Sequence, residues 1–166
     1  MPRVDSDTTV TQSVLDRLID SEPHSPTDPY TTRAHSVRQL KSSLRRDLEW
    51  LLNSRRIAVP PDDGERELLR SVYNYGLPDF SSYSINSPKD RGKLLRAIET
   101  TIAYFEPRLA GVKVSPIEMA GAGSRVLRFQ IEGMLLMDPA PEQVSFDTVL
   151  QLASGEYQVK GERSAG

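Results

Sequence analysis

The spacing of apolar residues changes once along this sequence, near residue 111, and that change restricts the chain to few architectures. Before it, apolar residues recur at the i, i+3, i+4 spacing of amphipathic helices. After it, they alternate with a period of two, as in strands with one buried face. Helices that precede strands in this way predict an α+β domain, in which an antiparallel β-meander packs its apolar face on the N-terminal helices.

Two segments near the N-terminus have an apolar stripe at helical spacing. A narrow stripe at residues 11–20 predicts a short outlying helix. The segment at 33–53 predicts the principal helix, with basic residues on another face. Its apolar stripe consists of Val37, Leu40, Leu44, Leu48, Leu51 and Leu52.

Capping signals predict two more helices. Asp62, with Glu65 three residues later, predicts a capping box at the start of a helix that Gly76 ends. Ser87 followed by Pro88 predicts another start, because serine caps helices and proline is favoured at the first helical position. The buried stripe expected in that helix is Leu94, Leu95, Ile98, Ile102 and Phe105.

Four segments after the change in period predict strands joined as hairpins. They are residues 112–119, 125–136, 144–152 and 156–160. The residues expected on the buried face of the middle two strands are Leu127, Phe129, Ile131, Leu135, Val144, Phe146, Leu150 and Leu152.

Length and composition favour one domain with little chemistry of its own. The 166 residues are enough for one sizeable core, and we expect a mobile arm at 1–32, a single domain at 33–160 and a tail at 161–166. The chain has no cysteine and only two histidines, His24 and His35, so we expect no zinc site and no disulfide. The sequence contains neither a signal peptide nor a membrane span, which predicts a cytoplasmic protein.

An acid and a base flank a proline where helix gives way to strand. Pro107 disfavours helical geometry at Glu106, so the helix is expected to end near Phe105. In an extended segment, Glu106 and Arg108 project to the same side and form a pair. That pair is either an internal ion pair or a polar anchor for a partner chain, and the two roles are compatible if assembly encloses the pair.

Four blocks of the sequence form a recognisable series, namely "SVRQLKSSLRRDLEWLLNSRR", "SVYNYGLPDF", "IETTIAYFEPRL" and "VSFDTVL". In order and spacing they closely resemble the TssE family of type VI secretion baseplate subunits, which belongs to the baseplate wedge proteins of contractile phages and is often labelled lysozyme-like. The resemblance covers residues 33–159. Ser54 departs from the family pattern, where threonine is expected.

The resemblance implies a structural subunit without a cofactor or a reaction. It implies that the chain joins TssF, TssG and TssK in the baseplate and links the baseplate to the sheath proteins TssB and TssC, without binding nucleic acid or inserting into a membrane. In the family the Glu-Pro-Arg element is an assembly determinant, so the resemblance assigns partner binding to Glu106, Pro107 and Arg108. Sheath contact by strand addition suits a meander with unpaired edges.

Two other functions stay open at the level of sequence. The lysozyme-like label suggests a glycosidase, for which Glu99 and Glu106 are the nearest pair of carboxyl groups, although the arginine beside Glu106 would lower its pKa rather than raise it. A nucleic-acid-binding helix is suggested by basic residues between 33 and 56, but the only aromatic residue among them is Trp50. Trp50 is expected to border the core, and the alternative is an exposed interface anchor. The basic residues are Arg33, Arg38, Lys41, Arg45, Arg46, Arg55 and Arg56.

We predict that the purified protein does not lyse peptidoglycan. The carboxyl pair is poorly suited to acid catalysis, and the sequence has no export signal to bring the chain to the cell wall. Turbidity of a peptidoglycan suspension measures this directly. Lysis that disappears in Glu99→Gln or Glu106→Gln would refute the structural interpretation.

Overall fold

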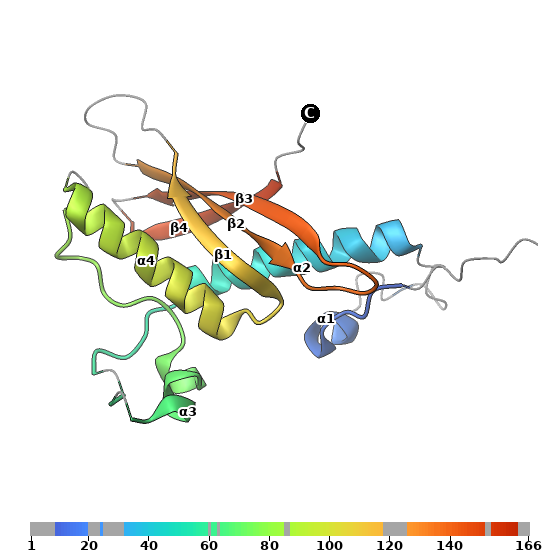
Figure 1. Cartoon of the computed structure of the whole chain (residues 1–166), viewed down its shortest axis with the longest axis horizontal. Helices are drawn as coiled ribbons and strands as arrows, with labels where there is room; N and C mark the ends of the chain where they lie inside the picture. Colours follow the sequence, from blue (N-terminus) through green and yellow to red (C-terminus); the bar gives the residue numbers. More distant parts are fainter. Residues whose placement is uncertain are drawn as a thin grey trace, which may run out of the picture. The chain divides into compact units, whose positions relative to one another are not determined.

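A computed structural model describes residues 9–19, 24, 32–59, 61–62, 64–84, 87–117, 126–151 and 154–162 (Figure 1). The chain divides into two compact units, Met1–Leu44 and Arg45–Gly166. Most of the arm predicted at 1–32, residues 163–166 of the predicted tail and the hairpin connection expected before the second strand lie outside the described residues. Residues 161–162, which were assigned to the tail, belong to the last strand instead.

The first unit contains helix α1 (Val14–Leu18) and the start of helix α2 (Arg33–Asn53). Both helices confirm the sequence prediction, although α1 is only five residues long. Ser13 caps α1, since its Oγ accepts a hydrogen bond from the backbone N–H of Asp16. Backbone N–H of Val10 donates to Oγ of Ser36, which ties the segment before α1 to the first turn of α2.

The second unit holds the remaining helices, α3 (Arg66–Leu69), the 3-10 turn η1 (Val72–Asn74) and α4 (Pro88–Phe105). Ser87 caps α4 and Pro88 begins it, as predicted. No helix in the described ranges is long and apolar enough to cross a membrane.

The capping box predicted for α3 is wrong. Glu65 is the N-cap residue and makes no side-chain cap, while Asp62 contributes only its backbone carbonyl, which accepts from the N–H of Glu65. The helix is also interrupted after Leu69. Ser71 explains the interruption, because its hydroxyl donates to the carbonyl of Leu68 and accepts from the N–H of Tyr73, in competition with helical backbone hydrogen bonds.

Four strands form an antiparallel meander, in the order β1-β2-β3-β4, and confirm the predicted α+β class. They are β1 (Leu109–Pro116), β2 (Val126–Leu135), β3 (Glu142–Gln151) and β4 (Glu156–Glu162). Helix α4 lies along β1 (Figure 1). The predicted inward residues of β2 and β3 are buried wherever the structure describes them, and Leu152 lies outside the described residues. The fully enclosed side chains of this unit include Leu48, Leu52, Ile98, Ile102, Leu127, Phe129, Ile131, Leu135 and Val144.

The loop after η1 is held against the end of α2. Backbone N–H of Leu77 donates to the carbonyl of Ser54 (2.8 Å), and the N–H of Arg56 donates to the carbonyl of Leu77 (3.0 Å). Gly76 makes this approach possible, since its φ is +102° and a Cβ there would lie 2.4 Å from the carbonyl oxygen of Ser54. The end of α2 and the loop at 76–78 therefore form one packed element.

We predict that Gly76→Ala lowers the free energy of unfolding by about 3 kcal/mol, since it combines backbone strain with a clash against backbone atoms. Denaturant unfolding monitored by Trp50 fluorescence measures the change. Gly111→Ala is the matched control, because Gly111 also has a positive φ (+62°) but open space where the Cβ would go. Equal losses in the two variants would show that the contact with Ser54 contributes nothing.

Candidate functional site

The Glu-Pro-Arg element forms a tight turn between α4 and β1. Helix α4 ends at Phe105, as predicted, and the N–H of Glu106 still donates to the carbonyl of Ile102. The carbonyl of Glu106 then accepts from the N–H of Leu109 (3.0 Å), which closes a turn over Pro107 and Arg108. The expected extended segment is therefore wrong, because this hydrogen bond folds the chain back at the proline.

Glu106 and Arg108 are nevertheless paired, and the turn brings them together. Nε of Arg108 lies 2.6 Å from Oε1 of Glu106, and Nη2 lies 2.7 Å from Oε2. This is a bidentate arrangement, the strongest and most directional form of an arginine–carboxylate pair. The carbonyl of Arg108 accepts from the N–H of Leu136 (2.8 Å), so the backbone beneath the pair is held by the end of β2.

Asp47 of α2 is a third member that sequence reasoning missed. Its Oδ2 accepts from Nη2 of Arg108 (2.6 Å), across 61 positions of sequence, and its Oδ1 accepts from Nε and Nη2 of Arg46 (3.1 and 2.9 Å). Asp47 lies four residues before the buried Leu51, beside the apolar stripe, and an acid in that position needs a basic partner. We call Arg46, Asp47, Glu106 and Arg108 the Glu106 cluster; its formal charges alternate and sum to zero.

The cluster is enclosed on the side of Glu106 and open on the side of α2. The side chain of Glu106 is 7% exposed, against 24% for Arg108 and 22% for Asp47. The hydrogen bond to Glu106 raises the pKa of Arg108 above its ordinary value, although burial opposes the rise. Nη1 of Arg108 is buried and has no hydrogen-bond partner in the described part of the chain. One donor of the cluster is therefore unused.

The field of the carboxylates extends to Tyr75. Burial raises the pKa of the Tyr75 phenol, and the nearby charges of Asp47 and Glu106 raise it further. The Tyr75 ring packs edge-to-face on Phe105, the last residue of α4, with ring centres 5.3 Å apart. The phenol therefore stays neutral beside the cluster.

Trp50 extends the cluster to the surface. The expectation that Trp50 borders the core is wrong, since it is 52% exposed. Its ring is covered instead by the guanidinium of Arg46, whose central carbon lies 4.9 Å from the ring centre. Pro107 is exposed as well. Arg46 thus joins an exposed aromatic side chain to the Glu106 cluster.

The carboxyl groups considered for glycoside hydrolysis have structural roles. Both oxygens of Glu106 bind Arg108, and Oε1 of Glu99 accepts from the backbone N–H of Val114 in β1 (2.8 Å). Nor is the basic segment a uniform positive face, because Arg46 is paired with Asp47, and Arg55 lies 3.5 Å from Asp79.

Comparison with known proteins gives one family. The model of the family "Baseplate wedge protein gp25" matches residues 38–140, which is more than half of the chain. Among solved structures, a chain of "The baseplate complex from the type VI secretion system" is similar, with 20% sequence identity and a TM-score of 0.48, over 69% of this chain and 96% of that chain. The comparison with curated proteins gives no match.

We predict that the members of the Glu106 cluster contribute unequally to the free energy of unfolding. Arg108→Met should cost about 2 kcal/mol, between the values for exposed and buried pairs, because it leaves Glu106 unpaired and Asp47 with Arg46 alone. Asp47→Asn should cost less than about 1 kcal/mol, since Arg108 keeps its bidentate bond to Glu106. Denaturant unfolding of both variants measures the two changes. A larger loss of unfolding free energy in Asp47→Asn than in Arg108→Met would contradict the central role given to Arg108.

Proposed function

The chain belongs to the baseplate wedge protein gp25 family, and from that premise we propose that it is a non-catalytic structural subunit of a type VI secretion baseplate. The observation that carries the proposal is the Glu106 cluster, a charged network that ends in an exposed tryptophan. Both of its carboxylates are held by arginines. Such an arrangement fits a protein that acts through its surface.

Partner binding is proposed for Glu106, Pro107 and Arg108, with TssF and TssG as the partners and TssK in the same assembly. Pro107 and Trp50 offer apolar surface, and Nη1 of Arg108 is a donor without a partner among the described residues. Interfaces commonly take most of their binding energy from buried tryptophan and arginine side chains. We therefore add Trp50 to the proposed contact surface.

Linkage to the sheath proteins TssB and TssC is proposed for the edges of the meander. The strand order leaves β1 and β4 at the two edges of the sheet. An edge strand presents backbone donors and acceptors to which a strand of another chain can bind. This assembly role implies a cytoplasmic location.

The test separates assembly from folding by changing the shape of the Arg108 side chain and keeping its charge. Lysine keeps a positive charge beside Glu106 and Asp47 but lacks the planar fork and the unused donor. Arg108→Lys should therefore reduce co-purification with TssF and TssG by about tenfold, with a melting temperature within about 5 °C of wild type. Glu106→Ala and Arg108→Ala should also weaken assembly more than they weaken the fold.

Arg128→Ala is the matched control, because Arg128 is an exposed arginine on β2 outside the cluster. It should leave both measurements unchanged. If the Glu106 and Arg108 variants unfold far below wild type, the pair is a core salt bridge and the interface proposal fails. Normal co-purification of Arg108→Lys would likewise refute it.

A further inference from the structure

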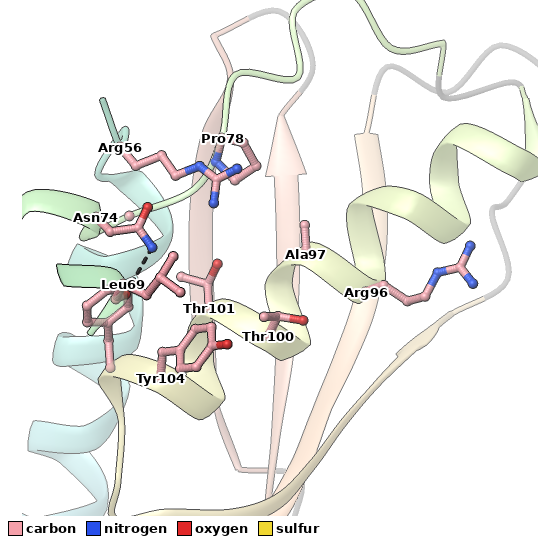
Figure 2. Close-up of a pocket in the computed structure, with 11 residues that line it drawn as sticks. Arg56, Leu69, Asn74, Pro78, Arg96, Ala97, Thr100, Thr101 and Tyr104 are labelled. Atoms are coloured by element: carbon pink, nitrogen blue, oxygen red, sulfur yellow. Dashed lines mark hydrogen bonds between the residues drawn. The ribbon is translucent and has the colours of Figure 1, made fainter. Parts of the chain in front are cut away.

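A second candidate binding site lies on helix α4, on the face that leads up to the turn of the Glu106 cluster. A pocket of about 250 Å³ is formed by the α3–η1 segment, the loop at 76–78 and one face of α4. Figure 2 shows Thr100, Thr101 and Tyr104 along the α4 side, with Asn74 and Leu69 facing them. Thr100 and Tyr104 are exposed, so the pocket opens to solvent.

Asn74 gives the pocket an unsatisfied acceptor. The residue is only 4% exposed, and its Nδ2 donates to the carbonyl of Leu69 (3.0 Å). A carbonyl only accepts, so this bond fixes the orientation of the amide and identifies Oδ1 as the remaining atom. Oδ1 is buried without a hydrogen-bond partner among the described residues. An unpaired buried acceptor is costly, and a donor entering the pocket would remove that cost.

The pocket is also one-sided in charge. Among the described residues, Arg56 and Arg96 line it and no carboxylate does, while the guanidinium of Arg70 lies 6.0 Å from the centre of the Tyr104 ring. Within the described part of the chain, none of these three arginines takes part in an ion pair. Figure 2 shows Arg56 beside Pro78 at one end and Arg96 at the other. Their separation favours an extended anionic ligand over a single small anion.

The volume argues against a cofactor. Cofactor and drug-like sites usually occupy roughly 300–1,000 Å³, so this pocket suits one or two side chains better. Leu69, Ala97 and Phe105 supply the apolar part of the lining. A peptide has all the required features, namely a backbone N–H for Asn74, an apolar side chain for the pocket and carboxylates for the arginines.

We propose that this pocket docks an extended acidic segment of another protein chain, with a backbone N–H on Oδ1 of Asn74 and carboxylates on Arg56 and Arg96. The site shares no residue with the Glu106 cluster. It does not depend on the baseplate assignment, so each proposal can fail without the other.

The test is an NMR titration of the full ¹⁵N-labelled chain with the capped peptide Ser-Asp-Leu-Ser-Glu-Leu-Ser. The side-chain amide of Asn74 and the backbone amides of Thr100 and Tyr104 should shift. A peptide with lysine in place of both acids should leave them unshifted. Arg96→Glu should weaken peptide binding about tenfold. Lys89→Glu makes the same charge change at an exposed site on α4 outside the pocket, so it should change the peptide affinity less than about twofold.

Four outcomes would overturn the proposal. The first is that the acidic peptide causes no shift at Asn74. The second is that the lysine peptide, or inorganic phosphate alone, shifts the same residues equally, which would mean that acidic peptides are not selected. The third is equal weakening by Arg96→Glu and Lys89→Glu. The last is a shift that depends on protein concentration without peptide, which would make a second copy of this chain the occupant.

Discussion

The guanidinium of Arg108 is the group on which the second unit depends. One planar group binds Glu106 at the end of α4 and Asp47 in α2, while its own backbone is paired with the end of β2. Helix, turn and sheet therefore meet at one side chain. A lysine has the same charge but cannot satisfy these acceptors with fixed geometry. The requirement for arginine follows from this geometry, whatever partner the surface binds.

Side chains from the helices also modify the edges of the sheet. Asn53, at the end of α2, donates from Nδ2 to the carbonyl of Tyr157 and accepts from its N–H at Oδ1, both at 2.9 Å. This amide occupies the edge groups of β4 as a neighbouring strand would. Glu99 does the same for one N–H of β1, at Val114. Part of each edge is thus blocked, which limits where another strand can pair and protects the chain from unselective association.

The predictable part of this structure is the part set by local periodicity. The change of period near residue 111 was enough for the fold class, and Ser87-Pro88 located the start of α4, because these signals act within a few residues. Pro107 also predicts the end of the helix correctly. The expected pairing of Glu106 with Arg108 is confirmed, but the extended segment from which it was inferred is absent. A turn, closed by a backbone hydrogen bond to Leu109, pairs them rather than an extended segment.

The misses share a tertiary cause. Asp47 lies within a basic stretch of the sequence, and only the fold brings it to Arg108, 61 positions away. The position of Trp50, two residues from Leu48 and Leu52, suggests the border of the core, but its ring is exposed and is covered by the guanidinium of Arg46. The helix expected to run to Gly76 stops at Leu69, because the hydroxyl of Ser71 competes for the backbone groups of Leu68 and Tyr73. Local sequence rules cannot decide between such alternative contacts, because the more stable one depends on tertiary packing that forms only on folding.

Helix α4 connects the two candidate surfaces and explains why both can be probed separately. Its C-terminal end leads into the turn of the Glu106 cluster, and its face at Thr100 and Tyr104 lines the pocket. Both surfaces rest on the buried stripe around Ile98 and Ile102, so changes in that stripe would disturb them together. Arg96, by contrast, is exposed on the pocket side, and Arg108 lies beyond the helix. When two substitutions lie at sites without shared contacts, their effects on the free energy of unfolding or binding usually add. Coupling between Arg96 and Arg108 substitutions would therefore require the helix itself to move when a partner binds.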